Sequence, residues 1–231
     1  MSIILFDFDG TITKRDTTDA VLEAFAMPPW QEIEEEWVAG RIGSRECMSR
    51  QLALVNASEA ELNELLDSLD VDEHFPALLD FCDSNNIEAH IISDGFDYFI
   101  KRILGRRSLG LKRALSKMTI SASHLEFKNG RIVTSFPFYE TGCAHGCATC
   151  KPTVMKNLNP ENQSTIFVGD GLSDRFAAAA ADVVFAKKKL LAHCRTESIP
   201  CFAYEDMGEI LTWMRERESP EWAGALSAVT A

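Results

Sequence analysis

The stretch LFDFDGTIT, residues 5–13, places two acids two positions apart directly behind an apolar run. Asp7 and Asp9 are followed by Gly10 and then by hydroxyl side chains. Two carboxylates held this close repel each other, unless a cation lies between them or each one caps a turn. A hard divalent cation such as Mg2+ prefers oxygen ligands of this kind. The stretch alone leaves the metal site and the turn caps as alternatives.

Three further stretches carry side chains that suit the same chemistry. AHIISDG contributes Ser93, CKP contributes Lys151, and VGDGLSD contributes Asp170 and Asp174. Lys151 opens a predicted helix, and the N-terminus of a helix attracts anions. Each stretch by itself has a structural explanation, because Asp-Gly turns and polar helix starts are common. Their occurrence together, in this order, favours one shared site over four separate structural roles.

Short apolar runs that end in Asp, Gly or Ser recur along the chain and predict the elements that position these residues. They are too short for typical helices and rich in Ile, Val and Phe, which suits strands buried on both faces. The five runs are IILFDFDG, AHIISDG, TIFVGDG, DVVFA and PCFAY. Strands that alternate with helices predict an α/β fold with a parallel sheet, whose ligands gather at the carboxyl ends of the strands. The predicted helices cover residues 75–85, 96–104, 173–181 and 206–217.

About eighty residues separate the first strand from the second, far more than a single crossover helix needs. Their apolar spacing predicts several helices, one of which, SEAELNELLDSL, opens with a Ser-x-x-Glu capping signature. An all-helical insertion at this point would lie over the strand ends as a cap. A second irregular stretch, SHLEFKNGRIVTSF, alternates around Asn-Gly and predicts a hairpin. We therefore expect a core of residues 1–16 and 72–220, a helical cap of residues 17–71, and a flexible tail of residues 221–231.

Composition narrows the class of protein. The chain has 231 residues and a formal net charge of -12, which disfavours broad nucleic-acid binding. It has no apolar run of about 18 residues, so we expect no membrane-spanning helix. Seven cysteines and no export signal favour a reduced, cytoplasmic protein. The expected partner is a small molecule, and the sequence does not indicate an oligomeric state.

The four motifs resemble those of the haloacid dehalogenase (HAD) superfamily of phosphatases, subfamily IB, which carries a helical C1 cap after the first strand. The resemblance runs from about Ile3 to Phe202. It implies a Rossmann-like core, one Mg2+ per active site and an aspartyl-phosphate mechanism, with Asp7 as the nucleophile and Asp9 as the acid and base. The implied metal ligands are Asp7, the Asp9 carbonyl, Asp170 and Asp174, and the implied phosphate contacts are Thr11, Ser93, Asp94, Gly95 and Lys151.

The substrate is less closely defined. Three stretches resemble the methionine-salvage family that dephosphorylates 2-hydroxy-3-keto-5-methylthiopentenyl-1-phosphate. They are ISDGFDYFI, CATCKPTVM and FAKKKLLAHC. Phosphocholine/phosphoethanolamine phosphatases and phosphoserine phosphatases are similar in layout, and a phosphate- or metal-binding module without turnover is a further alternative. Asp16 lies where phosphoserine phosphatases carry a substrate-facing acid, although it equally suits a helix N-cap. Arg50 lies beside Gln51, the position at which those enzymes carry a substrate-binding arginine.

A cysteine-rich stretch, GCAHGCATCKP, precedes Lys151. Cys143, Cys147 and Cys150, with His145 among them, have a spacing that suits a tetrahedral Zn2+ site. The match is partial, because no second close pair of ligands follows. Free thiols, structural Zn2+ and a transient disulfide are therefore the three interpretations of this stretch.

Overall fold

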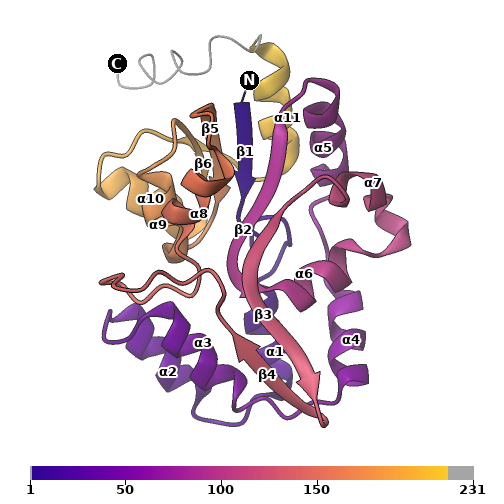
Figure 1. The fold of residues 1–231 in the computed structure, drawn as a ribbon, viewed down its shortest axis with the longest axis vertical. Coiled ribbons are helices and arrows are strands. Elements are labelled where there is room, and N and C mark those ends of the chain that lie inside the picture. The colour runs from indigo at the N-terminus through magenta and orange to yellow at the C-terminus, as the bar shows by residue number, and fades with distance from the viewer. Residues whose placement is uncertain (1, 218–231) are drawn as a thin grey trace.

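A computed structural model describes residues 2–217 of the chain (Figure 1). Its seven strands form one sheet in the order β4-β3-β2-β1-β5-β6-β7. Every neighbouring pair is parallel except β3 and β4. The prediction of an α/β fold built on a parallel sheet is therefore confirmed. The strands are β1 (Ser2–Phe6), β2 (Glu88–Phe96), β3 (Ile120–Lys128), β4 (Arg131–Ser135), β5 (Ser164–Gly169), β6 (Val183–Ala186) and β7 (Phe202–Ala203).

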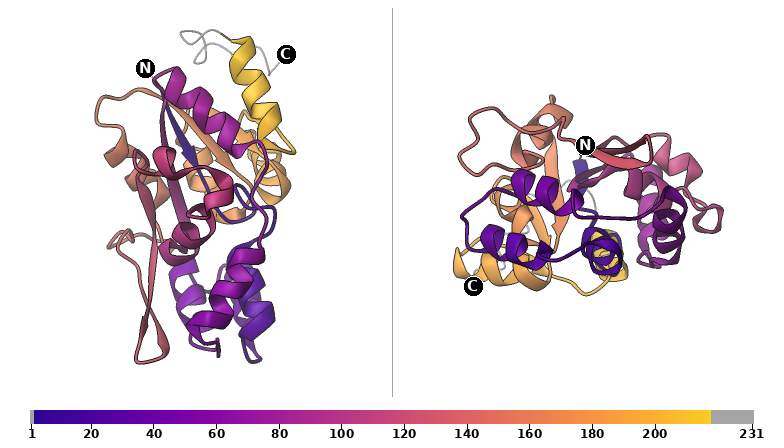
Figure 2. Two further views of the ribbon diagram at one scale, coloured as in Figure 1. Left: turned by 90° about the vertical axis from the view of Figure 1, so that its right-hand side faces the viewer. Right: turned by 90° about the horizontal axis from the view of Figure 1, so that it is seen from below.

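Both faces of the central strand are buried, as its continuous apolar run predicts. Ile3 and Leu5 point to one face of the sheet and Ile4 and Phe6 to the other, and all four side chains are at most 1% exposed. Each such burial stabilises the fold by about 1.5–3 kcal/mol. Helices cover the two faces (Figure 2). The first face packs on α8 (Lys151–Leu158), α9 (Arg175–Ala178) and α10 (Lys188–Thr196), and the second on α5 (Phe75–Ser84), α6 (Asp97–Leu104) and α11 (Met207–Glu216).

Four helices lie between β1 and α5 in the chain, beyond the carboxyl ends of the central strands (Figure 1). The two ends of this insertion lie side by side, because the Lys14 N–H donates to the Asp70 carbonyl at 3.0 Å. The predicted capping box forms between Ser58 and Glu61. A helical insertion is thus present, while its division from the core as a separate domain stays a prediction. The helices are α1 (Thr17–Phe25), α2 (Trp30–Val38), α3 (Ser44–Leu52) and α4 (Glu59–Ser68).

The remaining elements agree with the sequence in part. The predicted hairpin forms, with Asn129 and Gly130 both at positive φ between β3 and β4. The helix predicted over residues 173–181 is shorter, because a turn pinned by the Asp174 carboxylate precedes it and β6 follows closely. Within residues 2–217, no helix is long and apolar enough to cross a membrane. The predicted tail, residues 221–231, lies outside the described residues. The short elements are η1 (Arg107–Leu109), α7 (Lys112–Leu115) and η2 (Leu172–Asp174).

Candidate active site

The carboxyl ends of neighbouring strands bring the predicted acids together. Asp7 follows β1 and Asp170 follows β5, and the Asp7 N–H donates to the Val168 carbonyl at 2.9 Å. Asp174 joins them from the next turn. Carboxylate oxygens of the three acids lie within 4.8 Å of one another, and all three side chains are buried. The prediction that these distant parts of the chain come together is confirmed.

Lys151 supplies a buried positive charge between two of these acids. Its side chain is 1% exposed, and its Nζ lies 2.7 Å from Asp7 Oδ1 and 2.5 Å from Asp174 Oδ1. Burial opposes the charge, but the carboxylates of Asp174 and Asp7 outweigh it and raise the pKa of the lysine. Lys151 is therefore held as an ammonium ion directly beside Asp7.

The acids outnumber the cations that contact them. Burial and then the charge of Asp174 raise the pKa of Asp7 well above its usual value, although Lys151 opposes the shift. The same two causes raise the pKa of Asp170. Buried carboxylates with raised pKa values lack compensating positive charge, which a divalent cation would supply. Because the donors are all oxygen atoms, Asp7, Asp170 and Asp174 fit a hard cation such as Mg2+.

Asp9 is held by the start of the insertion. Its Oδ1 accepts hydrogen bonds from the Thr17 N–H, at 3.0 Å, and from the Thr17 hydroxyl. Its Oδ2 occupies the space that a side chain at Gly95 would fill, so any larger residue at position 95 would displace the Asp9 carboxylate. Burial raises the pKa of Asp9 to about 6, against the effect of the two hydrogen bonds. This carboxyl group is therefore suited to exchange a proton near neutral pH.

Ser93 lies in a bulge of β2. The pairing of β2 with β3 shifts register between Ile92 and Phe96, and such a bulge re-aims the side chains within it. Ser93 Oγ accepts a hydrogen bond from the Gly95 N–H at 3.0 Å, which leaves its own proton free to donate to a ligand. Asp7, Asp9, Ser93 and Gly95 all line one cavity.

Asp94, predicted to contact phosphate, has both carboxylate oxygens engaged elsewhere. Oδ2 accepts from the Ser44 hydroxyl at 2.5 Å, and Oδ1 accepts from the Thr149 N–H at 3.0 Å. Ser44 opens α3 in the insertion, and Thr149 lies in the loop before α8. Asp94 therefore joins three segments. Its carboxylate therefore positions these segments, while the residue itself lines the cavity, so a phosphate contact through its backbone stays a prediction.

Thr11 also differs from its predicted role. Its N–H donates to the Phe8 carbonyl at 3.2 Å, and its hydroxyl donates to Asp170 Oδ1 at 3.2 Å. It is 1% exposed and does not line the cavity. The tight turn at Gly10, with φ +70°, engages the Thr11 N–H. Thr11 instead orients one of the three clustered acids.

The two specificity candidates separate in the structure. Asp16 both caps α1, by accepting from the Asp19 N–H at 2.9 Å, and lines the cavity. Burial, followed by the charge of Asp9, raises its pKa well above the usual value. Arg50 instead pairs with Glu36, at 2.8 Å, on the outside of the insertion. Its neighbour Gln51 lines the cavity, because the two positions lie on different faces of α3.

The four predicted zinc ligands do not form a metal site. Cys143 and Cys147 have their Sγ atoms 4.0 Å apart, but Cys150 Sγ contacts the Thr153 hydroxyl and the His145 ring lies against Phe176, with centroids 4.2 Å apart. The acidic cluster is the only group of three or more gathered metal-binding side chains in residues 2–217. The zinc interpretation is therefore not supported. All seven cysteines, which lie within this range, are free.

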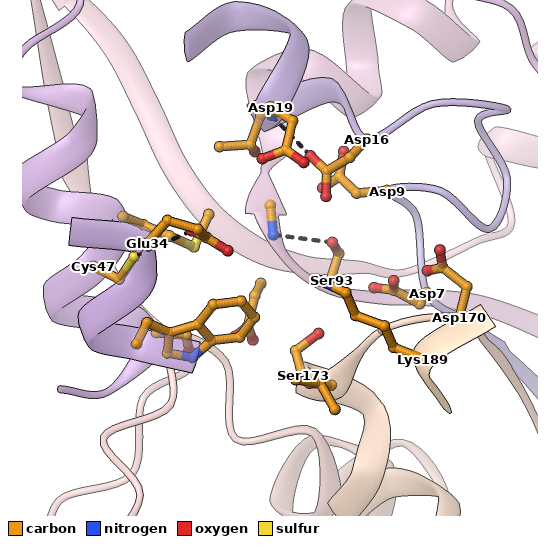
Figure 3. Close-up of a pocket in the computed structure, with 18 of the residues that line it drawn as sticks. Asp7, Asp9, Asp16, Asp19, Glu34, Cys47, Ser93, Asp170, Ser173 and Lys189 are labelled. Carbon is orange, nitrogen blue, oxygen red and sulfur yellow. Dashed lines mark hydrogen bonds between the residues drawn. The ribbon is translucent and has the colours of Figure 1, made fainter. Parts of the chain in front are cut away.

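A cavity of about 470 Å³ separates the strand ends from the insertion. Figure 3 shows Asp7, Asp9 and Asp170 on the core side, whereas Glu34 and Cys47 approach from the insertion helices. Sequence reasoning missed much of this lining, because the order of residues in the insertion does not indicate which helix face points inward. The added residues include Lys14, Arg15, Thr18, Asp19, Glu34, Trp37, Ser44, Cys47, Met48, Gln51, Leu172, Ser173, Lys188 and Lys189.

Lys188 adds a second cation to the acidic cluster. It has a left-handed backbone, with φ +48°, at the start of α10. Its Nζ lies 2.9 Å from Asp170 Oδ2 and 3.2 Å from the Gly10 carbonyl. Non-glycine residues in this backbone region cluster at functional sites. The available signal was the lysine run directly after a predicted strand, at the edge where ligands gather.

The chain is similar to known proteins along nearly its whole length. Residues 2–218 match the family described as Putative Phosphatase. The chain is 26% identical over 230 residues to the 2-hydroxy-3-keto-5-methylthiopentenyl-1-phosphate phosphatase of Bacillus velezensis, with 94% of this chain and 95% of that protein covered. It is 28% identical over 219 residues to the protein of the same name from Bacillus cereus strain AH187, with 93% and 97% covered.

Solved structures share the fold. A phospho-aspartyl intermediate analogue of a phosphoserine phosphatase superposes with a TM-score of 0.67 at 19% identity, covering 91% of this chain and 97% of that one. The phosphoserine phosphatase of T. onnurineus superposes with a TM-score of 0.67 at 14% identity, covering 94% and 96%. These similarities support the fold expected from the sequence motifs.

The buried ion cluster predicts the effect of removing its lysine. We expect Lys151→Met to lower the free energy of unfolding at pH 8 in EDTA by about 3–5 kcal/mol, because Asp7 loses its counter-ion. The loss should shrink toward pH 5. A carboxyl group whose folded pKa is raised stabilises the folded state at low pH, and this contribution is lost as pH rises through that pKa.

Urea unfolding at the two pH values measures both effects. The matched control is Lys156→Met, which removes an exposed lysine from the same helix and should change stability by less than about 0.5 kcal/mol. Equal stability of Lys151→Met and the unaltered protein at pH 8 would contradict the assignment of Lys151 as the counter-ion.

Proposed function

Because the chain belongs to the Putative Phosphatase family, we propose that it is a phosphatase of the HAD type, which hydrolyses a small phosphomonoester with Mg2+ through an aspartyl-phosphate intermediate. The observation that carries this proposal is the position of Asp7. It lies at a cavity wall, buried beside the Lys151 ammonium and close to two further carboxylates. We also propose a cytoplasmic location, where the seven free cysteines would stay reduced.

In the first step, an Asp7 oxygen attacks the phosphorus and the bond from phosphorus to the alcohol oxygen breaks. The Lys151 ammonium reduces the repulsion between the attacking carboxylate and the phosphate, and the Ser93 hydroxyl donates to a phosphoryl oxygen. Bound Mg2+, held by Asp7, Asp170 and Asp174, would add positive charge to the same region. Asp9 gives its proton to the departing alcohol oxygen.

In the second step, Asp9 acts as the base. Its carboxylate takes a proton from a water molecule, whose oxygen attacks the phosphorus of the aspartyl phosphate. The bond between phosphorus and Asp7 breaks, which restores the carboxylate and releases inorganic phosphate. Thr17 suits Asp9 to both steps, because it holds Oδ1 and leaves Oδ2 at the cavity beside Gly95.

The nucleophile is tested by Asp7→Asn, which keeps the shape of the side chain and removes its ability to attack. We expect phosphate release from p-nitrophenyl phosphate with Mg2+ to fall below detection, while the urea midpoint shows that the variant folds. EDTA should abolish the activity of the unaltered protein, and added Mg2+ should restore it. Asp80→Asn, at an exposed position of α5, is the control and should retain full activity. Turnover by Asp7→Asn would refute the nucleophile, and turnover in EDTA would refute the metal.

The role of Asp9 predicts a dependence on the leaving group. Asp9→Asn cannot protonate the alcohol, so formation of the phosphoenzyme should slow by about 10²–10⁴-fold with an alkyl phosphate. With p-nitrophenyl phosphate, whose leaving group needs little protonation, that step should slow much less, and the phosphoenzyme should accumulate because its hydrolysis lacks a base. Rapid-quench measurement of both phases checks this. An equal slowing of phosphoenzyme formation with the two substrates would contradict Asp9 as the acid.

Residues 17–71 act in this proposal as a cap that selects the alcohol. The first candidate substrate is 2-hydroxy-3-keto-5-methylthiopentenyl-1-phosphate, because relatives matched over nearly the whole chain carry that name. Trp37 and Met48 line the insertion side of the cavity and suit a methylthio group. The second candidate class is phosphorylated amines such as phosphoethanolamine and phosphocholine, because Asp16, Asp19 and Glu34 also line that side.

A substrate panel separates the two classes. It includes the methionine-salvage compound, phosphoethanolamine, phosphocholine, phosphoserine and pyridoxal phosphate, ranked by kcat/KM. We expect the methionine-salvage compound to rank first, and Glu34→Gln to leave its kcat/KM within about threefold, because the alcohol part of this substrate carries no positive charge for Glu34 to pair. If phosphorylated amines rank first and Glu34→Gln lowers their kcat/KM about tenfold, the second class replaces the first. Glu35→Gln, exposed on the same helix, is the control.

A further inference from the structure

Two cysteines outside the cavity have no role in the proposed reaction. Cys143 and Cys147 lie in the loop between β4 and α8, with their Sγ atoms 4.0 Å apart and both side chains partly exposed. Neither lines the cavity, and neither belongs to a gathered metal site. Two thiols this close, and within reach of solvent, form a dithiol that can be oxidised.

The two sulfur atoms differ in their surroundings. Burial and the charge of Asp94 raise the pKa of Cys147 to about 12. Burial also acts on Cys143, but hydrogen bonds from the backbone N–H groups of Cys147, His145 and Gly146, together with the Cys147 side chain, lower its pKa on balance. The thiolate is the reactive form of cysteine. Cys143 is therefore the sulfur that reacts first, with Cys147 as the neighbour that follows.

The same loop holds the insertion in place. The Gly146 carbonyl accepts from the Arg45 N–H at 3.1 Å, and the Ala148 N–H donates to the Ser44 hydroxyl at 2.9 Å. Both partners lie in the first turn of α3, whose Ser44 lines the cavity. Cys147 lies between the two residues that make these contacts. A displacement of Cys147 therefore acts directly on the two hydrogen bonds that hold the first turn of α3.

We propose that Cys143 and Cys147 are a redox modification site, which a peroxide converts to a reversible disulfide. This disulfide weakens the two hydrogen bonds that hold the start of α3. The Cys143 thiolate attacks one peroxide oxygen and the O–O bond breaks, which gives a sulfenic acid and hydroxide. Cys147 then attacks the Cys143 sulfur, the S–O bond breaks, and water leaves. Overall, two thiols and one hydrogen peroxide give one disulfide and two waters. A small dithiol reverses the reaction by exchange.

Closing the pair requires the sulfur atoms to approach from 4.0 Å to a bond length of about 2.05 Å. This movement pulls Cys147 toward Cys143 and strains the contacts of Gly146 and Ala148 with α3. Because α3 forms one wall of the cavity, we expect substrate to bind less tightly while Asp7 and Lys151 stay in place. This effect on catalysis, unlike the disulfide itself, rests on the proposed function.

The disulfide is tested on the full chain with hydrogen peroxide as the oxidant. We expect the first product to have lost two hydrogens, and differential alkylation with peptide mapping to place the bond between Cys143 and Cys147. Cys143→Ser and Cys147→Ser should not form this product, and Cys150→Ser, which changes the third cysteine of the loop, should still form it. Intact thiols under these conditions, or a first disulfide at any other pair such as Cys194 and Cys201, would overturn the proposal.

The coupling to α3 has a separate kinetic readout. With p-nitrophenyl phosphate, oxidation should raise KM by about three- to tenfold and change kcat less, as expected when roughly one hydrogen bond is lost. Dithiothreitol should restore KM, and Cys147→Ser should show no thiol-reversible change. An unchanged KM in the disulfide form would overturn the coupling. If the reduced protein releases no phosphate from any monoester, the proposed function fails, whereas the mass and mapping results still decide the disulfide.

Discussion

The structure depends on the burial of three like charges that two ammonium groups balance only in part. Asp7 and Asp174 each contact Lys151, and Asp170 contacts Lys188. The three acids lie close enough to share one ligand. Removing such charges from water costs several kcal/mol for each ion, and the cost is recovered only where opposite charges and hydrogen bonds are placed accurately. The parallel sheet supplies that accuracy, because its strand ends fix Asp7 and Asp170. The remaining excess of negative charge is what makes the site suited to a divalent cation.

The insertion takes part in this arrangement and does more than cover it. Thr17, in the first turn of α1, holds Asp9, and Ser44, in the first turn of α3, holds Asp94. Asp9 and Asp94 are therefore oriented by helices that also line the far side of the cavity. In the proposed mechanism, recognition of the alcohol and positioning for the chemistry would be linked through these two helix starts.

The loop before α8 extends this link to a third segment. It contacts α3 through Gly146 and Ala148, contacts Asp94 through Thr149, and then leads into the helix that carries Lys151. A change in its cysteines would therefore alter the position of α3 at the proposed substrate cavity, although neither sulfur of the pair lies in the cavity. The physical reason is that short hydrogen bonds, and not a flexible linker, join the loop to the insertion.

The sequence by itself determined the α/β fold, the helical insertion, and the acids that meet at the strand ends, because strand periodicity fixes where each strand stops and strand ends in a parallel sheet converge. It did not determine how side chains within the site divide their hydrogen bonds. The sequence does not show that the Thr11 hydroxyl donates to Asp170, or that the Asp94 carboxylate accepts from Ser44 and Thr149. It also did not place Gln51 instead of Arg50 at the cavity, nor bring Lys188 to Asp170. Those outcomes depend on which face of a helix packs inward and on contacts between residues far apart in the chain, and only the tertiary structure decides both.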